Sequence, residues 1–274
     1  MSELAGKRAL VTGASSGIGA AVARELAARG ASLVLTARRE QLLAEVAEAC
    51  RATGAAVETI VADLGTADGA ARLWAAASAR PVDICINNAG FGYFRAFRDA
   101  DVRRDAELLQ LNVTSLVEIS RRFVEARGDD AGRAYLVNVA SIGAYQSVPN
   151  FAVYAASKAF VRNFTEALHD ELRGSPISAT CICPGGTRTE FHGAAGAGNY
   201  GWLANKTMMT AEAVAKITIR AMEKGKRTVI PGVMNKLSCW SVRLVPRRFA
   251  SWMAGRVLGK PRREALPTRT SAAS

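Results

Sequence analysis

Histidine is scarce in this chain of 274 residues, which holds only His169 and His192, and cysteine occurs five times. The cysteines show no spacing typical of metal ligands; they are Cys50, Cys85, Cys181, Cys183 and Cys239. A metal site and a disulfide framework are therefore not expected. The alternation of Cys181 and Cys183 along an apolar run before Pro184 indicates instead one face of a strand.

A long hydrophobic run is also missing near the N-terminus. Residues 7–11 read Lys-Arg-Ala-Leu-Val, which is too short for a signal peptide or a membrane span. We therefore expect a cytoplasmic protein. Hydrophobic residues make up 49% of the chain, enough for a sizeable core, and the length suits one large α/β domain, placed at residues 1–231.

Acidic residues are scarce at the C-terminal end. From Lys236 to Ser274, nine lysines and arginines accompany the single acid Glu264, a local balance of +8 within a net charge of +12. An anionic partner of this end is one expectation. The main body has no basic patch interleaved with aromatics, so nucleic-acid binding is not expected.

Apolar runs of strand length alternate with amphipathic stretches of helix length. Strands are expected at 8–13, 32–37, 56–62, 82–87, 133–140, 178–183 and 228–230, and helices at 18–29, 40–53, 69–80, 103–126, 154–173 and 211–224. This alternation predicts a parallel sheet covered by helices on both faces. Such a doubly wound sheet binds its ligand at the carboxyl ends of the strands.

A glycine-rich turn connects the first expected strand to the first helix. It reads Thr12-Gly13-Ala14-Ser15-Ser16-Gly17-Ile18-Gly19. The glycines permit a tight turn, and the helix N-terminus offers N–H groups to a pyrophosphate. The alternative is an ordinary strand–helix turn, but its place after the first strand favours nucleotide binding.

Directly after the second expected strand stand two arginines, Arg38 and Arg39, and no acid. An acid at this point would bind the ribose 2′-hydroxyl of NAD, whereas arginine accommodates the 2′-phosphate of NADP. We assign Arg38 to that phosphate. Arg39 is either a second contact or merely the solvated start of the next helix.

Tyr154 and Lys158 stand four residues apart and therefore share one helix face. A nearby cation lowers the pKa of a phenol and makes it an acid suited to exchange a proton with a carbonyl or alcohol. Without a cofactor site around it, the same pair would be a packed aromatic beside a solvated lysine.

Five motifs in order resemble those of the classical short-chain dehydrogenases/reductases. They are residues 12–19, Asp63-Leu64, Asn87-Asn88-Ala89-Gly90, the segment from Ser141 to Lys158, and Pro184-Gly185-Gly186-Thr187-Arg188-Thr189. The resemblance implies a three-layer, Rossmann-type doubly wound sheet of about seven strands and the cofactor NADP(H).

The resemblance also implies cofactor contacts outside the glycine-rich turn. They fall to Asp63 and Leu64 at the adenine, to Asn88, Ala89 and Gly90 along the riboses, to Tyr154 and Lys158, and to Pro184, Gly185, Thr187 and Thr189 near the nicotinamide. For Asp63, a helix cap near Thr66 is an alternative that is compatible with this role.

Four catalytic residues are implied as well. Tyr154 is the proton donor in reduction, Lys158 lowers its pKa and holds the nicotinamide ribose, and Ser141 donates to the substrate oxygen. Asn112 matches the residue that holds a proton-relaying water; a mid-helix asparagine also marks a kink. A strand-end serine such as Ser141 is often only a turn residue.

Aromatic and apolar side chains near these motifs suggest an apolar substrate pocket. Its expected members are Phe91, Tyr93, Ile142, Tyr145, Phe191 and Trp202. The Gly- and Ala-rich stretch at about 185–209 is interpreted as a lid, with a plain linker as the alternative.

Beyond the expected domain, residues 232–258 form a basic amphipathic extension, and 259–274 are expected to be disordered. Phe249, Trp252, Met253 and Val257 fall on one helical face, which suits either a membrane surface or packing beside the pocket. This ending resembles that of reductases of fatty-acyl and steroid-like carbonyls.

The sequence thus predicts an NADPH-dependent reductase of an apolar ketone or 3-oxoacyl compound, acting reversibly on a small-molecule carbonyl or alcohol. The alternatives are an NADP(H)-binding sensor or scaffold without turnover, and a protein acting at a membrane surface on a lipid or steroid. The resemblance further implies a homodimer or homotetramer.

Overall fold

In the computed structural model, residues 4–128, 132–188 and 208–258 are described. Expectations for Thr189, Phe191, Trp202, most of the lid and the tail 259–274 lie outside the described residues.

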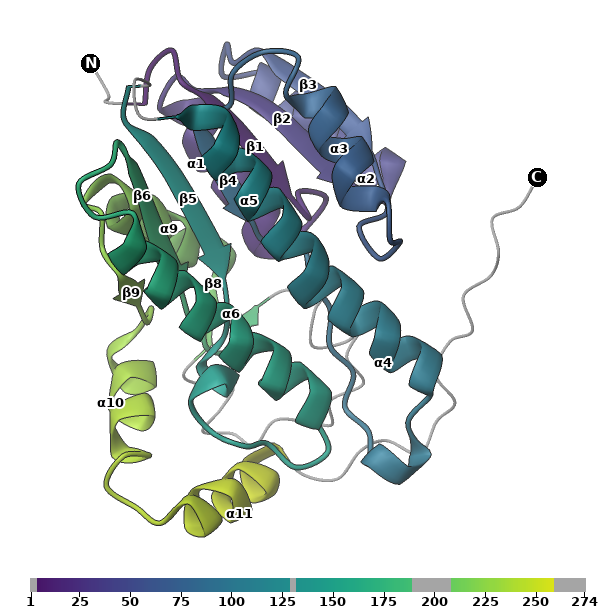
Figure 1. The fold of residues 1–274 in the computed structure, drawn as a ribbon, viewed down its shortest axis with the longest axis vertical. Helices are drawn as coiled ribbons and strands as arrows, with labels where there is room; N and C mark the ends of the chain where they lie inside the picture. Colours follow the sequence, from purple (N-terminus) through teal and green to yellow (C-terminus); the bar gives the residue numbers. More distant parts are fainter. Residues whose placement is uncertain (1–3, 129–131, 189–207, 259–274) are drawn as a thin grey trace.

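A seven-stranded sheet forms the centre of the described part of the chain (Figure 1). Its strands are β1 (Arg8–Thr12), β2 (Ser32–Ala37), β3 (Val57–Val61), β4 (Ile84–Asn87), β5 (Ala134–Val139), β6 (Ile177–Ile182) and β9 (Thr228–Val229). They follow the order β3-β2-β1-β4-β5-β6-β9, and every neighbouring pair is parallel. The predicted doubly wound sheet is confirmed, and each expected strand agrees with an observed one within two residues at either end.

Helices cover both faces of this sheet, as predicted. The described α-helices are α1 (Gly17–Ala28), α2 (Glu40–Arg51), α3 (Gly69–Ala77), α4 (Val102–Leu109), α5 (Ser115–Arg127), α6 (Ala152–Glu171), α9 (Ala211–Glu223), α10 (Val233–Ser241) and α11 (Arg247–Leu258), of which α10 and α11 do not cover the sheet (Figure 1). A short pair, β7 (Thr187–Arg188) and β8 (Met209–Thr210), lies apart from the main sheet.

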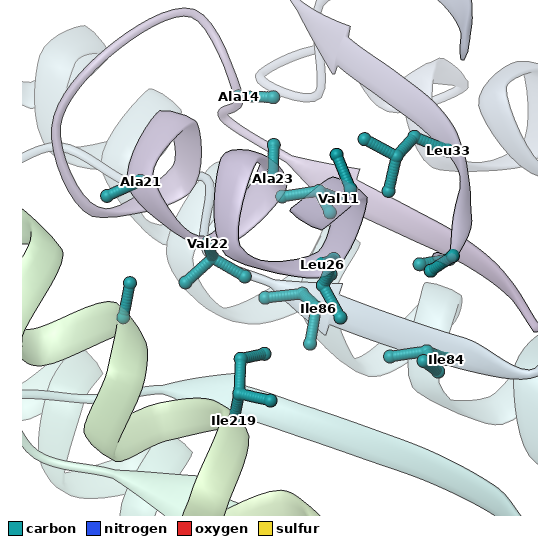
Figure 2. Packing of buried hydrophobic residues seen from close by; sticks show 14 of the residues in the cluster. Val11, Ala14, Ala21, Val22, Ala23, Leu26, Leu33, Ile84, Ile86 and Ile219 are labelled. Carbon is teal, nitrogen blue, oxygen red and sulfur yellow. The ribbon is translucent and has the colours of Figure 1, made fainter. Parts of the chain in front are cut away.

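The larger core cluster lies between the sheet and helices α1, α2 and α9 (Figure 2). Val22 and Leu26 of α1 pack beside Val11 and Ile86 of the sheet and Ile219 of α9. The second cluster covers the opposite face and includes residues of α3 and α5. Burying apolar side chains on both faces of the strands excludes water from the ladder and fixes its register.

The expected helix 103–126 is present, but it is not α-helical throughout. Between α4 and α5 the residues Gln110–Thr114 form a π-helical turn, which carries the fully buried Asn112. A π turn inserts one extra residue and so rotates the following face of the helix. The helix thus departs from regular α-helical hydrogen bonding at Asn112, and a kink at this residue stays a prediction.

The order in which strands are added to the sheet reverses between β1 and β4. Strands β2 and β3 lie on one side of β1, and β4 lies on the other. This switch point is where a doubly wound sheet opens a crevice at its carboxyl edge. Helices α10 and α11 lie beyond that edge in Figure 1. Of the described helices, none is both long and apolar enough to cross a membrane.

Candidate active site

The glycine-rich turn is clamped between β1 and β4. Gly13 and Gly17 adopt φ angles of +65° and +57°, which L side chains rarely allow. Thr12 Oγ1 accepts hydrogen bonds from the backbone N–H groups of Asn88 and Ala89, both at 3.0 Å. The glycine-rich turn therefore has a fixed shape and places the N-terminus of α1 at the crevice.

Gly19 has a packing role that differs from the expected cofactor contact. A Cβ there would lie 2.3 Å from the Gly13 carbonyl oxygen and 2.4 Å from Asn88 Nδ2. The other residues of the turn border a cavity at the crevice, and Gly19 does not; they are Gly13, Ser15, Ser16, Gly17 and Ile18. The absence of its side chain lets α1 approach the turn.

Both arginines after β2 line the same cavity. Arg39 Nη2 donates to Ser16 Oγ at 2.6 Å, so this arginine reaches the start of α1. Arg38 Nη1 lies 3.9 Å from Asp63 Oδ2, and its side chain is 51% exposed. The first turn of α1 contains no acid. Cations beside an N-terminus free of acids give this end of the cavity the chemistry of an anion site.

Asp63 lines the cavity with Leu64, but it does not cap a helix as the alternative supposed. Its Oδ1 accepts a hydrogen bond from Gly65 N at 2.9 Å, and Thr66 Oγ1 donates to its carbonyl oxygen. The residue before α3 is instead Asp68. Asp63 therefore closes a tight turn at the end of β3.

Lys158 is almost fully buried beneath the centre of the crevice, with Nζ donating to the carbonyl oxygen of Val139 at 2.9 Å. Burial lowers its pKa to about 8, because desolvation disfavours the ammonium form. Lys158 Nζ lies 5.8 Å from the centroid of the Tyr154 ring. The expected pair is thus brought together on α6.

The ring of Tyr154 packs against the ring of Phe151. The two rings stack with centroids 4.2 Å apart and planes inclined by 20°. Gly92 permits this arrangement, since a Cβ there would lie 2.6 Å from Tyr154 Cδ2. The phenol therefore has one fixed orientation, which a proton donor needs.

Ser141 follows β5 by two residues and begins the short 3-10 helix at Ile142–Tyr145. Its Oγ accepts a hydrogen bond from Gly143 N at 3.1 Å, as a turn serine does. A Cβ on Gly143 would lie 3.5 Å from Ser141 Oγ and 4.0 Å from Tyr154 Cε1, so both side chains border that residue. Ser141, Tyr154 and Lys158 all line the cavity.

Asn112 does not line the cavity. Its Oδ1 accepts from Phe91 N at 3.1 Å, and its Nδ2 donates to Phe91 O at 2.9 Å and Ser157 Oγ at 3.1 Å. The π turn directs this amide inward, where it joins the strand end after β4 to α6. In this structure Asn112 is a clamp between these segments, and its expected role in holding water stays a prediction.

One cavity of about 720 Å³ connects the glycine-rich turn with Ser141, Tyr154 and Lys158. It extends from the glycine-rich turn past Asn88, Ala89 and Gly90 to Ser141 and Tyr154, and also touches Pro184, Gly185 and Thr187. Phe91, Ile142 and Tyr145 line it, as expected for the substrate region.

Tyr93 is a correction, because it is buried without lining the cavity. Its hydroxyl donates to Asp105, and the Arg104 guanidinium lies over its ring at 5.3 Å. It packs against the layer that contains Tyr154. The contacts with Asp105 and Arg104 hold Tyr93 in this layer, whereas Phe91 borders the cavity.

The far wall comes from α10, α11 and the turn between them, and it was not assigned residue by residue from the sequence. It comprises Ser238, Cys239, Ser241, Val242, Val245, Phe249, Ala250, Met253 and Ala254. Ala250 and Ala254 are buried, and Ala254 packs with Val148 and Ala155. The predicted amphipathic helix is present as α11. Its small residues Ala250 and Ala254, four positions apart, face the rest of the protein and allow close packing. This spacing of two alanines was the sequence signal for that contact.

The site and fold agree with comparisons to known proteins. The family model of short chain dehydrogenases matches residues 7–199. The chain therefore belongs to the short-chain dehydrogenase family of oxidoreductases.

Relatives in this family include a putative ketoacyl reductase of granaticin polyketide synthesis from Streptomyces violaceoruber. It is 38% identical over 184 residues, which are 66% of this chain and 68% of the relative. Dehydrogenase/reductase SDR family member 7B of Rattus norvegicus is 31% identical over 261 residues, covering 90% of this chain and 80% of that protein.

Two solved structures share most of the architecture. A 7β-hydroxysteroid dehydrogenase superposes with a TM-score of 0.83 at 25% identity, over 92% of this chain and 98% of that one. A short-chain dehydrogenase from Sphingobium yanoikuyae in complex with NADPH gives a TM-score of 0.77 at 28% identity, over 94% and 98%.

Proposed function

We propose that this protein catalyses the reversible NADPH-dependent reduction of an apolar ketone or 3-oxoacyl compound to an alcohol. The observation that carries this proposal is the single cavity that joins an anion-binding end to Ser141, Tyr154 and Lys158 and then to an apolar wall. A reductase needs these three parts in that order, because cofactor and carbonyl must meet at the proton donor.

The residues at the anion-binding end fit NADPH. Arg38 and Arg39 beside Ser15 and Ser16 suit the 2′-phosphate, and the start of α1 suits the pyrophosphate. The similar dehydrogenase from Sphingobium yanoikuyae holds NADPH, which supports the same choice here. When bound, the nicotinamide supplies the hydride.

Around the carbonyl, this chain's own residues move the proton and stabilise charge. Tyr154 donates its proton to the substrate oxygen, and the Ser141 hydroxyl donates a hydrogen bond to the same oxygen as negative charge develops. The Lys158 ammonium on the neighbouring turn of α6 favours the phenolate that remains. In the oxidation direction Tyr154 acts as the base.

The substrate class follows from the far wall. Val242, Val245, Phe249 and Met253 present apolar surface to the end of the cavity beyond Tyr154. Similarity to a ketoacyl reductase and to a hydroxysteroid dehydrogenase supports a bulky apolar carbonyl.

The test is a panel of apolar ketones, steroid ketones and 3-oxoacyl thioesters, assayed by loss of NADPH absorbance with NADH in parallel. We expect turnover of at least one member and a preference for NADPH. Tight NADPH binding without turnover of any member would instead indicate a non-catalytic sensor, and a preference for NADH would overturn the role given to Arg38.

We also propose that residues 1–231 form one domain with 232–258 as an extension, and that the protein is a homodimer or homotetramer. Helix α6 offers an apolar surface for association, since Phe160 is 43% exposed and stacks on Phe164. Sedimentation velocity of wild type and Phe160→Asp would test this, and an unchanged assembly state would exclude this surface.

A further inference from the structure

Helix α10 presents an apolar face to solvent. Val233, Leu237 and Trp240 recur at helical spacing and are 71%, 54% and 59% exposed. Asn235 and Cys239, on the opposite face of the same helix, are buried. A helix packed on its own domain ordinarily has this polarity reversed, with the large apolar residues inward.

The outward direction of this face is fixed by the packing of the buried one. Asn235 Nδ2 donates to Pro231 O at 2.8 Å, and its side chain fills the space beside Gly185, whose Cβ would lie 2.5 Å from it. Cys239 faces the cavity. Helix α10 cannot bury Trp240 by rotation without losing these contacts.

Helix α11 and the turn before it continue the exposed apolar surface. Leu244, Phe249, Trp252 and Met253 are each between 45% and 66% exposed. With Val233, Met234, Leu237 and Trp240, they are eight of the thirteen exposed large hydrophobic residues in the described ranges. Such concentration marks an interaction surface rather than scattered exposure.

The charge of this surface is of one sign. Residues 232–258 contain no acid and five exposed cations, Lys236, Arg243, Arg247, Arg248 and Arg256. Arg256 lies over the Trp252 ring at 4.8 Å. A second copy of this chain docking face to face would bring the same positive charge, which opposes association. An anionic lipid surface brings the opposite charge, and tryptophan favours the boundary between lipid and water.

We propose that α10 and α11 form a docking surface for anionic lipid bilayers. Phe249 and Met253 belong both to this surface and to the cavity wall, so the cavity opens where the protein meets the bilayer. If the proposed reductase function holds, its carbonyl substrate enters from the lipid phase. This last step rests on the proposed function, whereas docking does not.

The docking test uses the full chain and sedimentation with vesicles of phosphatidylcholine, alone or mixed with phosphatidylglycerol. We expect binding to the mixed vesicles that weakens with added salt. Arg243→Glu and Arg247→Glu should each lower partitioning about fivefold or more, given the usual contribution of a cation near an anionic surface. Lys226→Glu, an exposed lysine beyond the end of α9, should leave it unchanged.

The apolar contribution is tested with Leu237→Ser combined with Trp240→Ser. Neither residue lines the cavity, so turnover of a short water-soluble carbonyl should be retained while vesicle binding falls at least tenfold. Val61→Ser, which removes an apolar side chain of 53% exposure from the edge strand β3, is the matched control and should bind like wild type.

Equal binding to both vesicle types, or no loss in the Leu237 and Trp240 variant, would overturn the proposal. Sedimentation velocity of the same variant tests whether a second copy of the chain covers this surface instead. Loss of self-association with unchanged vesicle binding would show a contact between copies and would overturn the proposal. Vesicle binding can be measured even if no carbonyl is ever turned over, so failure of the reductase function and failure of docking give different results.

Discussion

The two ends of the cavity are built in different ways. The anion-binding end is mostly backbone and polar groups at the carboxyl ends of β1, β2 and β4, locked by glycines whose missing side chains permit close contacts. The far end is formed mostly by apolar side chains of α10, α11 and the turn between them. A backbone site tolerates few substitutions, whereas a side-chain wall can change its shape with each one.

The largest effect on turnover is expected at Tyr154, which lies between the two ends of the cavity. Tyr154→Phe keeps the stack on Phe151 but removes the proton donor, so turnover should fall about 10²–10⁴-fold. NADPH binding, followed by fluorescence titration, should be retained. Preserved turnover would refute the assignment of Tyr154 as the acid.

At the anion-binding end, Gly19→Ala should damage the turn itself. The new Cβ would have to displace the Gly13 carbonyl and Asn88 Nδ2, at a cost of about 1–3 kcal/mol in the free energy of unfolding and with weaker NADPH binding. Gly132→Ala is the control, because nothing lies within 4 Å of its Cβ position and its φ is not positive. Denaturant unfolding of both variants checks this, and equal stability would remove the rigid-turn argument.

Substitution of Arg38, at the same end, should have a smaller effect that is confined to the choice between NADPH and NADH. Arg38→Leu should reduce the ratio of kcat/KM for NADPH to that for NADH about 10–100-fold, because a hydrogen-bonded charge contact to phosphate is lost. Arg39→Leu serves as the comparison, since its hydrogen bond to Ser16 predicts a part in the same contact. If the ratio of kcat/KM for NADPH to that for NADH is unchanged in both variants, other residues must set the cofactor preference.

The pKa of Lys158 predicts a pH dependence of cofactor capture. The pKa is lowered to about 8, so the ammonium predominates below that pH and is lost above it. If binding requires the charged form, kcat/KM for NADPH should fall up to about tenfold per pH unit above that value. Lys158→Arg keeps its charge and should remove this inflection. An inflection that persists in the variant would belong to another group.

The smallest effect is expected at the far wall. Phe249→Ala removes apolar surface from the cavity rim and should raise KM for an apolar carbonyl about fivefold to thirtyfold, with KM for NADPH unchanged. Trp252→Ala, on the same helix but outside the cavity lining, should leave both constants unaltered. A change in KM for NADPH in the Phe249 variant would contradict the separation of the two ends.

Most of the fold was predictable because it depends on local patterns. Continuous apolar runs with intervening amphipathic stretches specify a parallel sheet with two helical layers, and every expected strand is present. The spacing of Tyr154 and Lys158 also survives folding unchanged, since a helix converts four residues into one shared face.

Other residues required three-dimensional contacts to interpret. Gly19 belongs to a cofactor motif by spacing, yet its observed neighbours make it a packing residue. Tyr93 is an aromatic two residues after Phe91, and its side chain points into the core and not into the cavity. Arg39 gained a contact with the helix start that no pattern in its own segment indicates.

By itself, the sequence determined the parallel sheet, the glycine-rich turn and the pair on α6, because each depends on residues near one another in the chain. Only the tertiary structure decided which side chains form the far wall. Ala250 and Ala254 allow α11 to approach the body, and Asn235 seats α10 against Gly185, so a C-terminal extension closes a cavity whose other end begins at β1. Contacts across such a distance in the chain depend on shape complementarity, which periodicity does not encode.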